Sequence, residues 1–383
     1  MYWWRDFDLQ EVEHDFKQLA ANRLNLVRIF LLWEDFQPEP GEVDAKQLTN
    51  MQRTADLAYK YGLHLMITFF CGHMSGVNWM PAWMLTRQTC KGRFPVFSRN
   101  RTSQFIIRNC YVDPDVISAQ LLQIRLVAEA LKNHPAVYAY DLGNEPSNWV
   151  VPPCREDGRN WLRTMTAEIK QYSGGIPVTM GMHAEDLEED RRLGPADAAP
   201  YCDFLSMHGY PFYLEWVNEA DDGDLVPFLG LVTTWLGGKP VLLQEFGAPA
   251  RSDWDNQGAS LQPWSEARAA DYYQRVLQKL QRSGLMGAMA WCASDYAPSL
   301  WVKPPLDICP HERYFGLFHY DGTPKPAVKV WRQLNLPNID LTVEEIIRKN
   351  DWLQEVNPDQ FYLDPRNNLA KLYQQYKQWL KGR

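Results

Sequence analysis

The sequence lacks the motifs that mark several common enzyme classes. No GxGxxG follows its early apolar runs, no GxSxG occurs, and its eight histidines are scattered without zinc-ligand spacing. These absences disfavour a dinucleotide site, a serine hydrolase of the α/β type and a zinc centre. We therefore expect no cofactor and no catalytic metal.

Cysteine is present, but no two cysteines form a CxxC pair. The seven cysteines are an odd number, so they cannot all pair within the chain. Reduced thiols that pack in the interior are the simpler interpretation. A bridge between Cys90 and Cys110 is the alternative that stays open.

Long hydrophobic runs and an excess of positive charge are also missing. No apolar run reaches the roughly 18 residues that cross a bilayer, and residues 1–20 carry charges throughout. We see neither a signal peptide nor an anchor and expect a cytoplasmic chain, or a secreted one if an upstream segment is missing. The net charge of -8 argues against a nucleic-acid or membrane partner and favours a neutral ligand. Oligomeric state is left open.

Aromatic residues, by contrast, are plentiful. They make up 13% of the chain and include 16 tryptophans and 18 tyrosines. This is more flat, amphipathic surface than the core of one domain requires, so we expect some of these rings to line a groove.

Short apolar runs alternate with segments of helical spacing along most of the chain. The runs are at residues 25–33, 64–72, 137–146, 177–183, 204–211, 240–249 and 287–294. Alternation of buried strands with crossover helices predicts a parallel sheet, either doubly wound or a (β/α)8 barrel. Polar residues at the carboxyl ends of several runs favour the TIM barrel, which keeps its chemistry there.

The count of predicted strands is seven, whereas a complete barrel has eight. A helix predicted over residues 8–23 begins almost at once, and the eight residues before it are too few and too polar for a barrel strand. Either the first strand is missing from the N-terminus, or the barrel closes irregularly. The second option leaves unpaired backbone groups on a parallel edge, which should be costly.

Two further segments complete the predicted organisation. Residues 1–335 form the barrel domain, and within it residues 73–113 contain no convincing regular element, which suggests a wall or lid over the barrel mouth. Residues 336–383 are charged and helical, so we interpret them as a C-terminal helical extension without chemistry of its own.

Two carboxylates stand out at strand ends. Strand alternation places Glu145 on the same face as Asp141, and it places Glu245 on the same face as Leu243. If both strands belong to one barrel, the two carboxylates face each other across its mouth. Two facing carboxylates are what glycoside hydrolysis needs, at about 5–5.5 Å for a retaining enzyme or roughly 6.5–9.5 Å for an inverting one.

Five further motifs follow one another along the chain: VRIF, LGNEP, MHGYP, LLQEFGAP and AMAWCAS. Taken together and in this order, they resemble glycoside hydrolase clan A and most of all family 5, the cellulases and β-mannanases. The resemblance spans about residues 25–335. It implies a retaining mechanism with Glu145 as acid/base and Glu245 as nucleophile. It also implies that Asn144 holds the sugar 2-hydroxyl and that Arg28 and Tyr210 orient Glu245.

The resemblance places the remaining site residues as well. His208 would lie by the acid/base, Trp291 would form the floor under the sugar, and His73 stands where the family often has a histidine. Other candidates for sugar stacking are Trp33, Trp79, Trp83, Trp149 and Trp301, with loop anchoring as the alternative for each. Arg28 has the structural alternative of a pair with Asp141 or Asp35, and His208 and Tyr210 have that of packed core residues.

The expected function is therefore a retaining β-glycoside hydrolase that acts on a neutral β-linked glucan, mannan or oligosaccharide. A hypothesis from another class is a carbohydrate-binding protein on a degraded barrel that has lost turnover together with its first strand. Hydrolysis of aryl β-glycosides separates the two.

Overall fold

The computed structural model describes residues 1–252, 262–334 and 341–382. The chain divides into two compact units. Unit 1 comprises Met1–Gly181, Arg191–Leu193 and Pro200–Asp203. Unit 2 comprises Met182–Asp190, Gly194–Ala199 and Phe204–Arg383.

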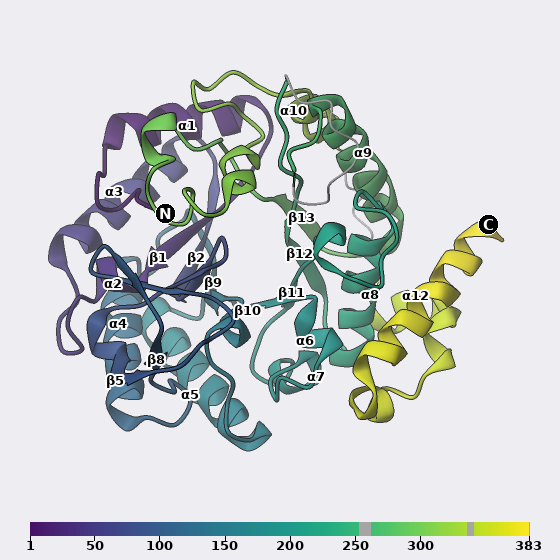
Figure 1. The fold of residues 1–383 in the computed structure, drawn as a ribbon, viewed down its shortest axis with the longest axis horizontal. Coiled ribbons are helices and arrows are strands. Elements are labelled where there is room, and N and C mark those ends of the chain that lie inside the picture. The colour runs from purple at the N-terminus through teal and green to yellow at the C-terminus, as the bar shows by residue number, and fades with distance from the viewer. Residues whose placement is uncertain (253–261, 335–340, 383) are drawn as a thin grey trace. The chain divides into compact units, whose positions relative to one another are not determined.

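The main sheet contains seven strands, which follow one another in chain order: β1, β2, β9 and β10, and then β11, β12 and β13 (Figure 1). The β1–β2, β2–β9 and β9–β10 pairs are parallel, and so are the β11–β12 and β12–β13 pairs. All seven predicted strands are confirmed, and the α/β class with them. Because β1 and β13 end this order, the main sheet within the described residues has seven strands and not eight.

Unit 1 contains most of the first half of the chain. Its helices are α1 Leu9–Ala21, α2 Trp33–Phe36, α3 Ala45–Lys60, α4 Pro114–Ala130 and α5 Arg155–Ser173, with short 3-10 turns η1 Ala82–Met84 and η2 Pro146–Asn148. Its main-sheet strands are β1 Leu26–Leu32, β2 His64–Cys71 and β9 Val137–Asn144, and β10 Val178–His183 continues into unit 2. Helices α3 and α4 begin where Asp44 and Asp113 accept backbone N–H groups, which are otherwise unpaired at a helix start.

The N-terminal residues form a turn against β1, not a strand. The Trp4 indole donates to the carbonyl of Phe30 in β1 at 2.7 Å, and its ring packs edge-on against Phe36. Arg5 forms ion pairs with Glu34 and Asp35 at the end of the same strand. The prediction that these eight residues form no strand is confirmed, although Tyr2 and Trp4 are buried.

The segment from residue 73 to residue 113, which we call the insert, is richer in structure than its sequence suggested. It carries β3 His73–Met74, β4 Val77–Trp79, β5 Leu85–Thr89, β6 Val96–Ser98, β7 Arg101–Ser103 and β8 Phe105–Ile107. These strands form one four-stranded sheet, β3-β4-β6-β7, and one two-stranded sheet, β5-β8. The expectation of no regular element was wrong, because strands of two to five residues are too short for a visible alternation of apolar and polar positions.

Unit 2 contains the remaining elements. They are α6 Glu185–Glu188, α7 Pro195–Ala198, β11 Leu205–His208, η3 Pro211–Tyr213, α8 Leu225–Gly237, β12 Val241–Phe246, α9 Glu266–Ser283, β13 Gly287–Ala290, η4 Pro298–Leu300, η5 Pro310–Tyr314, α10 Pro326–Arg332, α11 Val343–Lys349, η6 Asp351–Glu355, η7 Pro358–Leu363 and α12 Pro365–Lys381. Ser265 caps the start of α9, and Gly284 ends it in a left-handed conformation that suits glycine.

Helix α8 explains why unit 2 continues into further helices. Its sequence LVPFLGLVTTWLG is apolar on almost every side, and its first ten residues are buried. A helix that is hydrophobic all round needs cover on all sides. Strands β11 and β12 and helices α7 and α9 pack on part of its surface, and the C-terminal helices cover a further part. Helix α12 lies beside α8 (Figure 1), and the Phe228 ring contacts Trp352, Tyr373 and Tyr376.

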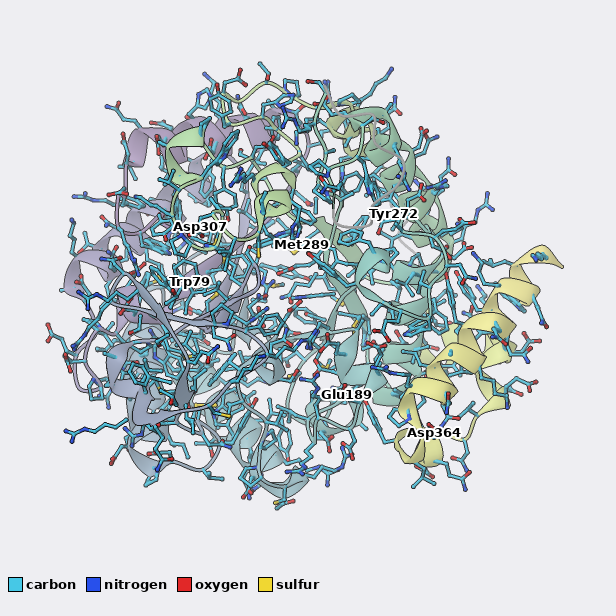
Figure 2. The ribbon with its side chains drawn as sticks, in the orientation of Figure 1. Trp79, Glu189, Tyr272, Met289, Asp307 and Asp364 are labelled. Atoms are coloured by element: carbon cyan, nitrogen blue, oxygen red, sulfur yellow. The ribbon has the colours of Figure 1, made fainter. Side chains whose placement is uncertain are left out.

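The predicted C-terminal helical extension is therefore helical and packs on its own unit. Polar contacts also hold α12, and we call them the charged anchor of α12. Tyr373 donates to Asp222 at 2.6 Å, and Lys377 contacts Asp224 at 2.6 Å. Asp364, labelled in Figure 2, stands immediately before α12 and accepts from Asn367. The predicted boundary at residues 335/336 lies outside the described residues.

Two expectations about composition can be compared with the structure. All seven cysteines fall within described residues and are free thiols, so the alternative of a Cys90–Cys110 bridge was wrong. In the part of the chain that the structure describes, no helix is both long and apolar enough to cross a membrane.

Candidate active site

The end of β9 contains a bulge that places Asn144 on an unexpected side. Asp141 pairs with Thr179 in β10, whereas Asn144 pairs with Gly181, so β9 holds one residue more than its partner over this stretch. Gly143 and Glu145 have φ values of 118° and 45°, the left-handed region in which Glu145 is unusual. In a regular strand, Asn144 and Asp141 would point to opposite faces of the sheet. Because of the bulge, both side chains contact the same guanidinium group.

That guanidinium belongs to Arg28 in β1. Its Nη2 donates to Asp141 Oδ2 at 2.6 Å and to Asn144 Oδ1 at 2.9 Å. Thr68 in β2 also donates to Asp141 Oδ2, at 2.8 Å. A buried charge needs such partners, so this network joins three neighbouring strands and fixes the Asn144 amide.

Both structural alternatives for Arg28 can now be placed. The pair with Asp141 exists, while Asp35 pairs instead with Arg5 at 2.7 Å. Burial raises the pKa of the Asp35 carboxyl, and the charge of Arg5 opposes that rise.

Glu145 follows β9 and lies among amide and imidazole groups of unit 1. Asn148 Nδ2 donates to its Oε2 at 2.9 Å, and His73 Nε2 lies 3.9 Å from the same oxygen. Its side chain is 14% exposed, so the carboxyl is largely desolvated yet reaches the surface. Asn144 Nδ2 donates to the His73 carbonyl at 2.9 Å, which ties the insert to the end of β9.

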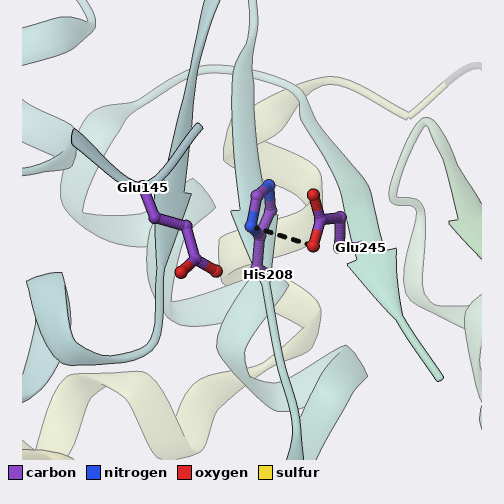
Figure 3. A group of neighbouring side chains, drawn as sticks. All are labelled: Glu145, His208 and Glu245. Atoms are coloured by element: carbon purple, nitrogen blue, oxygen red, sulfur yellow. Dashed lines mark ion pairs between the residues drawn. The ribbon is translucent and has the colours of Figure 1, made fainter. Parts of the chain in front are cut away.

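Glu245 lies on β12 in unit 2, where a second irregularity shapes its surroundings. The register between β11 and β12 shifts after Met207, so that His208 pairs with Glu245. His208 Nδ1 lies 3.6 Å from Glu245 Oε2, as the dashed line of Figure 3 marks, and its Nε2 is 2.9 Å from Gln244 Oε1. The histidine therefore reaches two successive side chains of β12.

The predicted hydrogen bond from Tyr210 to Glu245 is present. The phenol donates to Glu245 Oε2 at 3.0 Å, and only 6% of the Glu245 side chain is exposed. A donor to a buried carboxylate stabilises its ionised form, which is the form a nucleophile requires. Glu145 and Glu245 thus have different settings: amide and imidazole around the first, phenol and imidazole around the second.

The predicted sugar-stacking tryptophans fall into two groups. Trp33 and Trp79, the latter labelled in Figure 2, are 0% and 2% exposed, and their indoles donate to Gln37 and to the Met74 carbonyl. A sugar cannot stack on a ring that is enclosed on both faces, so we interpret these two as packing anchors. Trp83, Trp149, Trp291 and Trp301 are partly exposed, so they stay candidates for contact with a sugar. The Arg313 guanidinium lies over the Trp301 ring, 5.0 Å from its centroid.

The loop after β12 approaches Trp291 closely. A Cβ atom at Gly247 would lie 2.2 Å from the Trp291 carbonyl oxygen. Trp291 N–H donates to the Phe246 carbonyl at 2.9 Å. Only glycine fits this approach, which explains the glycine in the QEFG motif.

Several polar residues near these carboxylates were not predicted, namely Thr68, Asn78, Asn148 and Gln244. They bind protein groups, and only Gln244 lies within one of the quoted motifs, LLQEFGAP. Asn78 was hidden in the insert, although the Ser75-Gly76 pair before it is a turn signal that could have revealed its hairpin. The contact of Gln244 with His208 depends on the register shift between β11 and β12, which the motif does not show.

The side chains whose chemistry suits a metal ion are Glu145, His208 and Glu245, all drawn in Figure 3. Carboxylate and imidazole groups equally serve as acid, base and nucleophile.

A parallel α/β sheet whose strand ends carry two carboxylates, each held by specific donors, has the architecture of a glycoside hydrolase. Comparison with family models gives the same class and makes it specific. The cellulase model, glycosyl hydrolase family 5, matches residues 2–296. The chain belongs to this family, as the order of its motifs predicted.

Solved structures of similar proteins agree on the fold. A GH5_18 protein from Streptomyces cattleya, solved in complex with GlcNAc, has a TM-score of 0.73 at 22% identity, and the match covers 97% of this chain and 92% of that one. The exo-beta-1,4-mannosidase Op5Man5 from Opitutaceae bacterium strain TAV5 has a TM-score of 0.72 at 25% identity, over 87% of this chain and 56% of that one.

Curated relatives match over a smaller share of their own length. The beta-galactosidase Pbg of Clostridium perfringens is 21% identical over 78% of this chain and 50% of its own length. The beta-glucuronidase of Rattus norvegicus is 22% identical over 53% of this chain and 29% of its own length. The chain thus spans half or less of the length of these relatives.

Proposed function

We propose that the protein is a retaining β-glycoside hydrolase in which Glu145 is the acid/base and Glu245 is the nucleophile. The observation that carries this proposal is the difference between the two carboxylates. Glu245 receives the Tyr210 hydroxyl, which favours the ionised form. Glu145 stands in a left-handed turn after β9, where amide and imidazole groups surround it.

The proposed reaction has two displacements. In the first, a Glu245 oxygen bonds to the anomeric carbon while the glycosidic bond breaks, and the Glu145 proton passes to the leaving oxygen. In the second, Glu145 takes a proton from water, the water oxygen bonds to the anomeric carbon, and the ester bond to Glu245 breaks. Both carboxyl groups return to their starting forms and the anomeric configuration is retained.

The remaining site residues have supporting roles in this proposal. Asn144, held by Arg28, offers an amide to the sugar 2-hydroxyl. Arg28, His208 and Tyr210 fix the positions of charged or reacting groups, and preorganised donors of this kind supply much of an enzyme's rate enhancement. Trp291, and to a lesser extent Trp149 and Trp301, offer ring faces to a sugar.

β-Mannosides are the substrate class that we propose first. The Opitutaceae protein is named an exo-beta-1,4-mannosidase, and a Streptomyces cattleya GH5_18 protein was solved in complex with Manb1-4GlcNAc. The net charge of -8 favours a neutral sugar over an acidic one such as a glucuronide. β-Glucosides are the main competitor among neutral substrates.

The test is a panel of aryl β-mannosides, β-glucosides, β-galactosides and β-glucuronides, with the product anomer followed by NMR. We expect turnover of the β-mannoside with retention. Glu245→Ala should lose roughly 10⁴-fold or more in kcat, and azide should restore turnover as the α-glycosyl azide. Glu145→Ala with azide should instead yield the β-glycosyl azide.

Glu129→Gln on the exposed face of α4 is the matched control and should keep full activity. An inverted product, or full activity in Glu245→Ala, would overturn the mechanism. Sugar binding without turnover by the unaltered chain would support the degraded-barrel hypothesis instead.

A further inference from the structure

The first strands of the insert form a tight hairpin that places His73 opposite Asn78. Strand β3 is joined to β4 by Ser75 and Gly76, whose φ values are 55° and 74°. Two successive positive φ values define the hairpin turn whose twist matches that of the strands. His73 and Asn78 are direct cross-strand partners, so the hairpin sets their separation.

Asn78 has both of its amide atoms engaged, and this fixes which atom faces His73. Its Nδ2 donates to the Asn148 carbonyl at 3.4 Å, and a carbonyl can only accept. The Oδ1 atom therefore faces His73 Nδ1, at 2.8 Å. An amide oxygen also only accepts, so His73 Nδ1 must carry the proton.

These contacts form a closed circuit of four residues, which includes Glu145. We call it the Glu145 ring: Glu145, Asn148, Asn78 and His73. Asn148 Nδ2 donates to Glu145 Oε2 at 2.9 Å, and His73 Nε2 returns to the same oxygen at 3.9 Å. His73 and Asn78 are 5% and 4% exposed. The Phe94 ring, 4.4 Å from the imidazole centroid, restricts its rotation further.

We propose that Asn78 is a positioning residue for acid catalysis: it fixes His73 in the Nδ1–H form, so that the bare Nε2 faces Glu145 and favours the protonated carboxyl. This inference rests on the proposed function of Glu145. A bare nitrogen has its negative end toward the carboxyl, whereas an N–H or an imidazolium there would favour the carboxylate. Among the described residues of unit 1, other charged groups near the ring include Arg28 and Asp141, which pair with each other, and Arg191, which donates to the Ser147 carbonyl. Arg93 is also near, with its guanidinium carbon 4.8 Å from the centroid of the Phe94 ring.

The inference predicts a dependence on the leaving group. Departure of an alkyl or sugar oxygen needs the Glu145 proton, whereas departure of a dinitrophenolate does not. We expect Asn78→Ala to lower kcat by about tenfold on a disaccharide or methyl glycoside and by less than about threefold on the dinitrophenyl glycoside. KM for the disaccharide should stay within about twofold, because Asn78 acts through His73 and not on the sugar.

A pH profile separates positioning from mere support. In Asn78→Asp the carboxylate still accepts from His73 Nδ1 but favours the imidazolium. The positive charge next to Glu145 should move the alkaline limb of kcat/KM to lower pH. Asn78→Asp should also recover part of the disaccharide rate that Asn78→Ala loses, when both are measured on the acid side of that limb.

Asn109→Ala is the matched control in the same insert. Its Nδ2 donates to the Val151 carbonyl at 3.0 Å, so it loses a similar bridge without touching His73. We expect this variant to lose stability but to show no leaving-group dependence and no pH shift. Equal rate loss on both leaving groups in Asn78→Ala, or an unmoved alkaline limb in Asn78→Asp, would overturn the inference.

Glu145→Ala separates this inference from the proposed function. If Glu145→Ala loses rate on poor leaving groups and the Asn78 variants do not, only the role of Asn78 fails. If Glu145→Ala itself shows no such dependence, the assignment of the acid/base fails first.

Discussion

The insert and the C-terminal extension are both additions to the same α/β sheet, yet they are built in opposite ways. The insert is a set of very short strands whose polar side chains reach a catalytic candidate: His73 lies next to Glu145, and Asn78 holds His73. The extension is a set of helices whose aromatic side chains cover α8. We therefore expect the first addition to act on the chemistry of the proposed site and the second to act on the stability of unit 2.

This difference shows where function can be sought in an enlarged barrel. Buried polar side chains near strand ends are good candidates for specificity and chemistry. Burying them costs stability, so a function is a reason for them to be kept. Large apolar contacts between helices stabilise without reference to a substrate. Variants that separate activity from stability should therefore act differently in the two segments.

The largest expected effect is on stability and comes from the extension. Trp352 is 4% exposed and packs against Phe228 and Tyr376, so Trp352→Ala leaves a large cavity. We expect a loss of about 3–5 kcal/mol in the free energy of unfolding, measured by urea denaturation. The kcat of the protein that remains folded should be unchanged. Trp379→Ala, at a partly exposed position of α12, is the control and should cost much less.

A smaller effect, this time on activity, is expected from the hairpin of the insert. Gly76→Val forces a branched side chain into a positive φ and should loosen the pairing of His73 with Asn78. We expect kcat on a disaccharide to fall by about tenfold, with a much smaller change in the urea midpoint. Gly62→Val introduces the same strain at φ 68°, in the turn before β2, and should leave kcat unchanged. Equal activity loss in both variants would remove the contrast between the two segments.

The smallest effect concerns the charged anchor of α12. Burial raises the pKa of Asp224, but hydrogen bonds from Lys279 and Lys377 outweigh it and hold the pKa below its usual value. A carboxyl whose pKa is lowered on folding contributes stability above its unfolded pKa and loses that contribution as the pH falls through its folded pKa.

Lys377→Met should therefore lower the free energy of unfolding near pH 7 by about 1 kcal/mol or less. The difference from the parent protein should shrink as the pH falls below about 4, in urea titrations across that range. A difference that grows in acid would contradict the assigned sign. Activity should not change at any pH at which the variant is folded.

Much of the fold could be predicted from the sequence, because its strands are long enough to show their pattern. All seven main strands lie within the predicted runs, and helix α1 at Leu9–Ala21 lies within the helix predicted over residues 8–23. Gly and Pro at segment ends were sufficient to separate them.

The site could be predicted in its residues but not in its geometry. Strand alternation assumes an unbroken register, whereas both β9 and β12 shift register close to Glu145 and Glu245. The register shift in β9 allows Arg28 to contact both Asp141 and Asn144. Bulges leave little trace in one sequence, since Gly143 looks like any glycine in a strand.

The tryptophans show another limit of a single sequence. Trp33 and Trp149 stand in similar aromatic surroundings, and their rings lie 5.9 Å apart. Yet Trp33 is fully enclosed, while Trp149 is partly exposed. Exposure depends on which segments pack over a ring, and those segments lie far away in the chain.

Helix α8 also has a consequence for how the chain emerges from the ribosome. The helix ends at Gly237, but three of the rings that cover its Phe228 side chain belong to Trp352, Tyr373 and Tyr376. Because chains fold domain by domain as they are synthesised, we expect this side of α8 to stay exposed until α12 has been made, although α7, β11 and β12 already pack on the helix. A ribosome that stalls after α8 and before α12 therefore leaves a nascent chain with an exposed apolar surface, to which we expect chaperones to bind.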